Sequence, residues 1–289
     1  MHFVEAKALL SRWNGMNLYR GCAHGCVYCD SRSTCYQFTH PFEDIEVKRN
    51  APELLEDTLK RRRKRAVIST GSMSDPYQPC EKELRLTRRC LEIIERYGFG
   101  ASVITKSDLV LRDLDLFKSI NRSAKSVLQM TLTVADDTLS RLLEPNVCTT
   151  TRRYEVLKAF QRQGIPAVVW MTPILPFLTD TEENIRRILD YCFDADVKGI
   201  VCYGAGVTLR EGDREYYYRA LDRHFPGLSD EYRRRYGNAY EVNSPHSTAL
   251  MRLFHDACER RGVLHDPEEC FRYIAELPEK KEQLSLFDY

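Results

Sequence analysis

Short apolar runs alternate with longer amphipathic segments over most of the chain. The runs at 66–69, 101–104, 126–132, 166–170 and 198–203 predict strands, and 17–19 leads into a cysteine-containing loop. Apolar positions with helical spacing predict helices at 52–65, 84–97, 112–120, 151–163 and 180–195, with Asn50 and either Thr179 or Asp180 as N-caps. Because this alternation favours parallel strands with right-handed crossovers, we predict an α/β fold, a partial (β/α)6 TIM-like barrel with a C-terminal helical extension.

The same pattern divides the chain into four parts. We expect an N-terminal leader at 1–13, a barrel core at 14–225, a helical C-terminal extension at 226–275 and a flexible tail at 276–289. Phe3 and Trp13 in the leader are expected to pack on the core.

Composition narrows the class of protein. With 43 basic and 42 acidic residues the net charge is +1, so any contact with nucleic acid must come from local patches. No apolar run approaches the ~20 residues that span a bilayer, and we expect no membrane partner. Eleven cysteines without a secretory signal indicate metal ligands and buried thiols in a reducing cytoplasm.

Three cysteines lie close together near the start of the chain. Cys22, Cys26 and Cys29 have the spacing C-x3-C-x2-C, and three thiolates can hold a [4Fe–4S] cluster while leaving one iron open. The alternative is a zinc site, which needs a fourth ligand, and His24 and His40 are the nearest candidates.

Polar segments with glycine or proline follow nearly every predicted strand. In parallel α/β barrels such segments meet at one end, where functional groups gather. Lys106 follows an apolar strand and is expected to point into the barrel mouth, where it would pair with a carboxylate. Ser74 and Asp75 are expected to contact a cofactor or substrate. The segments are 21–30, 71–79, 105–107, 131–133, 172–176 and 203–206.

Five segments together resemble the radical S-adenosylmethionine (radical SAM) superfamily, in the branch related to spore photoproduct lyase. They are 17–29, 71–79, 105–107, 143–145 and 173–176, and the resemblance covers 14–225. It implies a [4Fe–4S] cluster on the three cysteines and reductive cleavage of S-adenosylmethionine to a 5′-deoxyadenosyl radical. That radical removes hydrogen from a substrate, here DNA or another nucleic acid.

The resemblance also implies how the cofactor is held and reduced. S-adenosylmethionine is expected to contact Tyr28 at its adenine, and Ser74, Asp75, Lys106 and Ser107 elsewhere. A reductase, flavodoxin or ferredoxin would supply the electron. The protein would contribute placement and exclusion of water.

One position departs from the lyase pattern. Where the lyase has a hydrogen-donating cysteine, this chain has Ser72, a poor hydrogen-atom donor. Cys80 and Tyr77 are therefore the predicted catalytic residues. Two other classes stay open: a radical SAM enzyme that modifies a peptide, protein or small metabolite, and a non-catalytic metal-binding docking protein.

Two further patterns concern partners. Arginines 233–235 lie among tyrosines, a mixture that suits either nucleic acid or an ordinary solvated helix with aromatic anchors. Near the C-terminus, Gln283, Leu284, Ser285, Leu286 and Phe287 resemble the short peptide that docks bacterial proteins on the DNA sliding clamp. The alternative is a tail that packs on its own domain.

Overall fold

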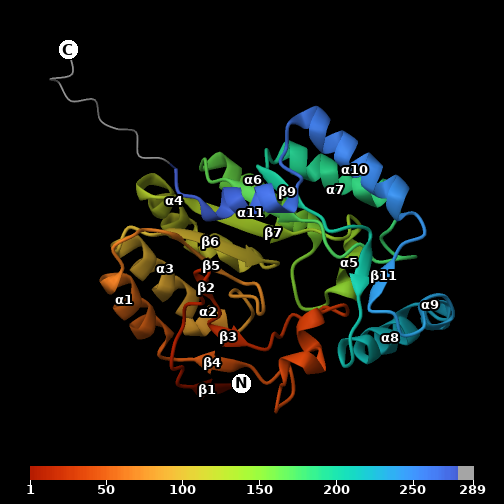
Figure 1. Ribbon diagram of the computed structural model, residues 1–289, viewed down its shortest axis with the longest axis horizontal. Coiled ribbons are helices and arrows are strands. Elements are labelled where there is room, and N and C mark those ends of the chain that lie inside the picture. Colours follow the sequence, from red (N-terminus) through yellow and green to blue (C-terminus); the bar gives the residue numbers. More distant parts are fainter. Residues whose placement is uncertain (279–289) are drawn as a thin grey trace.

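A six-stranded parallel sheet forms the centre of the protein in this computed structural model, which describes residues 1–278 (Figure 1). Strand order in the sheet equals strand order in the chain, and among the described residues the first and last strands do not pair. The prediction of an open, partial barrel is therefore confirmed. The strands are β2 (Gly15–Met16), β5 (Val67–Thr70), β6 (Gly100–Thr105), β7 (Ser126–Thr131), β8 (Ala167–Trp170) and β9 (Gly199–Val201).

Helices connect successive strands and cover one face of the sheet. Their apolar stripes share a core with alternate strand residues such as Leu128, Val169 and Ile200. The long connecting helices are α1 (Ala51–Arg61), α3 (Leu86–Arg96), α4 (Leu114–Ser123), α6 (Thr150–Arg162) and α7 (Glu182–Asp194). Shorter helices are η1 (Asp30–Arg32), η2 (Thr34–Tyr36), α2 (Glu81–Leu84), η3 (Asp108–Asp113) and α5 (Asp137–Leu143).

The expected helix caps are only partly correct. Asn50 precedes α1, but its side chain bonds the backbone N–H and C=O of Ala6, each at 2.9 Å, so it ties the N-terminal segment instead of capping the helix. Helix α7 is capped by Thr181, whose hydroxyl accepts from the Asn184 N–H. The prediction of Thr179 or Asp180 was wrong by one or two residues.

Residues expected to form a leader are part of a second small sheet. β1 (His2–Val4) pairs in parallel with β4 (Glu46–Lys48), which pairs antiparallel with β3 (Tyr19–Arg20) just before the cysteine loop. The expectation that Phe3 and Trp13 pack on the core was wrong, because their exposed fractions are 52% and 81%.

The tyrosine-rich segment after β9 packs in a core that it shares with the cysteine loop, at Cys26, Val27 and Tyr28. Tyr217 and Tyr232 are fully buried, their hydroxyls lie 3.0 Å apart, and Tyr232 donates to the Pro176 carbonyl at 2.7 Å. These tyrosines anchor helices rather than present a surface to nucleic acid. The elements are β10 (Gly206–Thr208), α8 (Asp213–His224), α9 (Leu228–Tyr236), β11 (Glu241–Asn243) and α10 (Ser247–Arg261). β10 precedes residue 225 and pairs with β11, which follows it, so this two-stranded sheet includes segments from both sides of the predicted domain boundary. The boundary at 225 stays a prediction.

The last helix, α11 (Pro267–Ala275), packs on the sheet face that the other helices leave open (Figure 1). Cys270 and Ile274 contact a layer of buried valines at 127, 168 and 201. A Cβ on Gly199 would lie 2.8 Å from the Cys270 sulfur, so glycine permits this close approach. Helix α11 therefore fills the lower interior of the partial barrel.

Two expectations concern membranes and the tail. Within residues 1–278, none of the helices combines the length and apolar character needed to cross a bilayer. The segment Gln283–Phe287, predicted to bind a sliding clamp, lies outside the described residues.

Candidate active site

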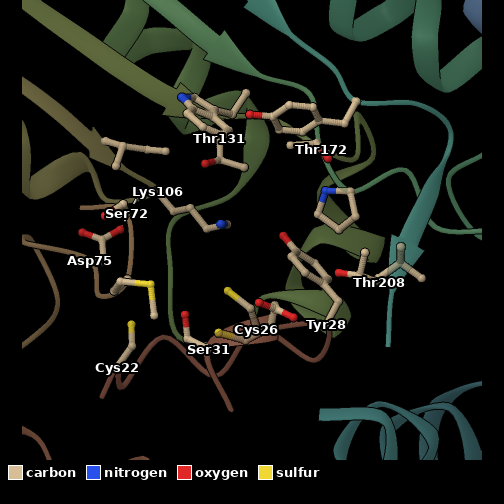
Figure 2. A pocket seen from close by; sticks show the side chains of 18 of the residues that line it. Cys22, Cys26, Tyr28, Ser31, Ser72, Asp75, Lys106, Thr131, Thr172 and Thr208 are labelled. Carbon is tan, nitrogen blue, oxygen red and sulfur yellow. Dashed lines mark hydrogen bonds between the residues drawn. The ribbon is translucent and has the colours of Figure 1, made fainter. Parts of the chain in front are cut away.

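A cavity of about 590 Å³ opens at the carboxyl ends of the central strands (Figure 2). This volume lies within the range usual for small-molecule sites. Its walls come from the cysteine loop, the loop after β5, the ends of β6 to β9, and the β10–β11 pair. Alternating strands and helices thus bring the polar segments at the strand ends to one place, as the sequence predicted.

The three cysteines of the C-x3-C-x2-C loop line the cavity. Figure 2 shows two of them, Cys22 and Cys26, on the same wall. Burial raises the pKa of Cys26 and Cys29. Burial also acts to raise the pKa of Cys22, but the neighbouring His24 outweighs it and the pKa is lowered. Three thiols that line one cavity can each bind one iron of a [4Fe–4S] cluster and leave the fourth iron open.

The cysteine loop is held from behind by the loop that follows β5. Ser74 donates to the Gly21 carbonyl, and Gln78 accepts from the Ala23 N–H at 3.1 Å while donating to Ser74 at 3.2 Å. Gly21 has φ +87°, and a Cβ there would lie 2.4 Å from the Phe42 carbonyl oxygen. Ser74 lines the cavity, but its hydroxyl already orients the loop.

Asp75 joins three segments of the site. Its carboxylate accepts from the Thr105 hydroxyl at 2.7 Å and from the backbone N–H groups of Lys106 and Tyr77, each at 2.8 Å. It also faces His24 at 3.3 Å. Burial acts to lower the pKa of His24, but the charge of Asp75 outweighs this effect and raises it to about 10. Sequence reasoning placed Asp75 in the site but missed this pair.

Lys106 differs from its neighbours because its charge is left free. Its side chain extends from the end of β6 into the middle of the cavity (Figure 2). The ammonium lies 5.8 Å from the centre of the Tyr28 ring, and the described part of the chain gives it neither a hydrogen bond nor an ion pair. Burial acts to lower the pKa of Lys106, yet the thiol group of Cys26 and the carboxylate of Glu144 raise it. A free, charged ammonium fits a cofactor carboxylate.

Behind the cysteine loop lies a buried charge network. Tyr28 donates to Glu144 and lies 3.4 Å from the Thr133 hydroxyl. Glu144 pairs with Arg153 at 2.6 Å, and both side chains are fully buried. Arg153 also donates to the Thr131 and Cys148 carbonyls. The sequence motif contained Glu144, but nothing in the helical pattern distinguished Arg153 from a surface arginine.

Only some of the remaining predicted residues line the cavity. Ser72 lines the cavity, at the position where a thiol was expected. Tyr77 lies outside this lining, fully buried, with its hydroxyl on Asp113 at 3.0 Å. Cys80 is also absent from the lining and directly precedes α2. The Ser107 hydroxyl accepts from the Leu109 N–H in the first turn of η3. The catalytic roles of Tyr77 and Cys80 stay predictions.

Across the cavity from Cys22 and Cys26 lies a wall that carries Thr131 and Thr172 together with aromatic side chains (Figure 2). Trp170 and Tyr203 line it with their rings 6.3 Å apart, and Tyr203 is 61% exposed. Trp170 is fixed by donation to Gln129 at 2.7 Å, which in turn donates to Ser102. Sequence reasoning included Tyr203 in a strand-end segment but did not single out Trp170, which looked like an ordinary core residue.

Comparisons with known proteins agree with this arrangement. Residues 16–192, more than half of the chain, match the family model of the radical SAM superfamily. A protein of Mycobacterium tuberculosis (strain ATCC 25618 / H37Rv), described as uncharacterized, is 31% identical over 238 residues, covering 80% of this chain and 69% of the relative. A protein of Pseudomonas phage M6 named radical SAM Nalpha-GlyT isomerase is 24% identical over 171 residues, covering 58% of this chain and 34% of the relative.

Solved structures share the fold. A spore photoproduct lyase variant superposes with a TM-score of 0.63 at 15% identity, covering 91% of this chain and 80% of the other. A second variant, with bound AdoMet and dinucleoside spore photoproduct, has a TM-score of 0.61 at 15% identity and covers 86% and 74%. The cavity's thiols and free ammonium fit the cofactors of the matched family. The chain is therefore a member of the radical SAM superfamily, whose enzymes use a [4Fe–4S] cluster and S-adenosylmethionine.

Proposed function

We propose that this radical SAM enzyme abstracts hydrogen from a nucleic acid in a lyase-like or other rearranging reaction. Cys22, Cys26 and Cys29 hold the cluster, and Lys106 binds the carboxylate of S-adenosylmethionine. When bound, the cofactors supply hydrogen-atom abstraction after a one-electron reduction by a reductase, flavodoxin or ferredoxin.

The protein's own contribution is placement. Ser74 and Gln78 fix the backbone of the cysteine loop, and Asp75 fixes the end of β6 beside it. Lys106 then extends from a backbone whose N–H is bonded to Asp75, so its ammonium is aimed by the same group that holds His24. Tyr28, with its hydroxyl on Glu144, presents a ring that cannot swing out of the wall.

The single observation that carries the nucleic-acid proposal is the aromatic wall. Tyr203, largely exposed, and Trp170, held by Gln129, lie on the cavity side opposite the cysteines. Every nucleobase has a flat π face, and stacking on such rings contributes about 1–3 kcal/mol per base. A base lying on Tyr203 would be separated from the cysteine wall by the cavity itself, which is where the cofactor fits.

Two named proteins support the choice of reaction. The fold neighbour is a lyase solved with a dinucleoside photoproduct, and the phage relative is named an isomerase. Lyases and isomerases rearrange bonds within one substrate and need no external oxidant. Such chemistry is compatible with Ser72, because a hydrogen taken from the substrate can be returned from the cofactor instead of from a protein thiol.

The test is anaerobic reconstitution of the cluster, followed by reduction in the presence of S-adenosylmethionine and single-stranded or duplex oligonucleotides. We expect deuterium from a labelled oligonucleotide to appear in the recovered S-adenosylmethionine, because returning hydrogen to the substrate regenerates the cofactor, and in the 5′-deoxyadenosine released by turnovers that stop before this return. Absence of both 5′-deoxyadenosine and deuterated cofactor would contradict the enzyme assignment. Formation of 5′-deoxyadenosine without deuterium transfer from any oligonucleotide would instead favour a peptide, protein or small metabolite as substrate.

A further inference from the structure

A second cluster of metal-binding side chains lies away from the cysteines, on the small sheet at the N-terminus. His2, His40 and Glu46 each offer one ligand atom, and these atoms lie within 4.8 Å of one another. His2 and Glu46 are direct neighbours in the β1–β4 register, and His40 reaches them from the loop before β4. Within the described residues this is the one group of three such side chains whose ligand atoms all lie within 4.8 Å of one another.

Hydrogen bonds already orient both imidazoles for ligation. His2 Nδ1 lies 3.0 Å from an Asp44 carboxylate oxygen, and His40 Nδ1 lies 3.0 Å from the Pro41 carbonyl oxygen. An Nδ1–H that donates to oxygen leaves Nε2 as the ligand atom, and this arrangement is typical of histidines bound to metals. The Nε2 of His40 points at Glu46, 2.7 Å from Oε1.

The geometry points to a divalent metal site of the zinc class, with His2, His40 and Glu46 as ligands and water completing the shell. Two imidazoles and a carboxylate form the borderline nitrogen and oxygen donor set that zinc accepts. Zinc at about 2.1 Å from each ligand requires ligand atoms roughly 3.4 Å apart. Side-chain rotations that move each ligand atom by about 1 Å are therefore enough to form the site. The proton shared by His40 and Glu46 leaves to solvent when the metal takes its place.

Charge around the group permits a cation. Arg20 Nη1 lies 3.3 Å from Glu46 Oε1, the same oxygen that His40 contacts, and Arg20 Nη2 donates to the carbonyls of Tyr36 and Gln37. Within residues 1–278 these contacts leave the second oxygen of Glu46 without a hydrogen bond. With Asp44 counted, two carboxylates face Arg20 and the Met1 ammonium, which lies 2.9 Å from Asp44, so neutral imidazoles leave the group without net charge.

The position indicates a structural role. A metal here joins β1 and the loop before β4 to β4, whose other neighbour, β3, ends at Arg20, two residues before Cys22. It would brace the base of the cysteine loop without entering the cavity, since none of the three ligands lines it. This inference is independent of the proposed reaction and of its substrate.

Zinc binding by the full, cluster-loaded chain tests the site. We expect one Zn²⁺ per chain to survive desalting under anaerobic conditions, and H2Q or H40Q to weaken zinc affinity, measured by chelator competition, by about 100-fold. D44N, which changes the partner of the His2 imidazole and of the Met1 ammonium but removes none of the three ligands, should weaken it about 10- to 100-fold. H265Q is the matched control, because His255 and His265 have ring centroids 5.2 Å apart but form no group of three with an acid in residues 1–278.

X-ray absorption at the zinc edge keeps the test independent of folding. We expect nitrogen and oxygen neighbours at about 2.0–2.1 Å and no sulfur shell near 2.3 Å. A sulfur shell, failure of the unmodified chain to retain zinc, or equal affinity in H40Q and H265Q would overturn the site. If H40Q loses iron or ellipticity, E46Q decides instead, and retained affinity in E46Q overturns the proposal equally.

Discussion

The two walls of the cavity are built on opposite principles. On the wall formed by the cysteine loop and the β5 and β6 ends, Ser74 and Asp75 are engaged with other parts of the chain, and Glu144 behind this wall is paired with Arg153. On the wall formed by the β8 and β9 ends, Tyr203 stands 61% exposed. The first wall is preorganised around one free charge, Lys106, and the second is open to whatever enters.

This difference suggests that the two walls bind different molecules. A cofactor that is the same in every turnover gains from a rigid wall, because little ordering is left for binding to cost. A substrate that must enter and leave gains from an exposed surface. The following changes break or sharpen this comparison.

The largest effect should come from the cysteines. C26A removes one of three thiols on the rigid wall, and we expect complete loss of the cluster absorbance and of 5′-deoxyadenosine formation. C192A is the control, because Cys192 is a buried thiol of α7 that lies outside the cavity. Iron content and product analysis measure the result, and a C26A chain that retained four irons with activity would contradict the assignment.

The next largest effect concerns the buried pair behind the rigid wall. E144Q leaves Arg153 charged and unpaired where both side chains are fully buried, and should destabilise the fold by about 3–5 kcal/mol in denaturant unfolding. The double variant E144L/R153M removes both charges and should recover most of that loss. A double variant as unstable as E144Q would show that the network has a role beyond charge pairing.

Replacing the free charge should affect cofactor binding alone. K106M should weaken S-adenosylmethionine binding by about 3 kcal/mol, roughly 100-fold, because a desolvated charged hydrogen bond is lost. Cluster content should not change, since Lys106 donates to none of the loop residues. K82M, an exposed lysine of α2, is the control, and equal affinity of K106M and K82M for the cofactor would sink the role.

The open wall should show a smaller and different effect. Y203A should raise the KM for an oligonucleotide about tenfold, the contribution of one stacked base, while S-adenosylmethionine affinity stays the same. W13A removes an aromatic residue that is even more exposed, at 81%, and should change neither quantity. Loss of cofactor affinity in Y203A would contradict the separation of the two walls.

The smallest effect is expected from Cys80. Its thiol lies outside the cavity lining, and burial raises its pKa to about 11, so it is neither near the reacting groups nor ionised. C80S should leave 5′-deoxyadenosine formation unchanged within about twofold. A large loss would support the original prediction that this thiol donates hydrogen.

Much of the fold followed from local patterns. Strand and helix periodicity predicted five of the six central strands to within about two residues, because buried parallel strands are short apolar runs with clear boundaries. The β1–β4–β3 sheet was not predicted, because strands of two or three residues have too few positions to show an alternation of apolar and polar side chains. Helix α11 was expected as part of an appended extension, yet it packs inside the barrel, and only long-range contacts specify that position.

The site divides in the same way. The spacing of the cysteines and the strand-end position of Lys106 are local signals, and both predicted the cavity wall that the structure shows. The Glu144–Arg153 pair and the His24–Asp75 pair join residues 9 and 51 positions apart along different elements, so no spacing rule identifies them. Pairing of distant charges depends on the tertiary fold.

The position of α11 inside the barrel affects where another molecule could be attached to the chain. Helix α11 occupies the interior of the partial barrel, and the described chain ends near it. Leu277 lies beside Gly100, at the amino-terminal end of β6. The cavity opens at the carboxyl ends of the same strands. A tether at the described end of the chain, beside Leu277, would therefore lie at the end of the barrel opposite the cavity mouth. Such a tether raises the local concentration of enzyme near its target without competing for the entrance.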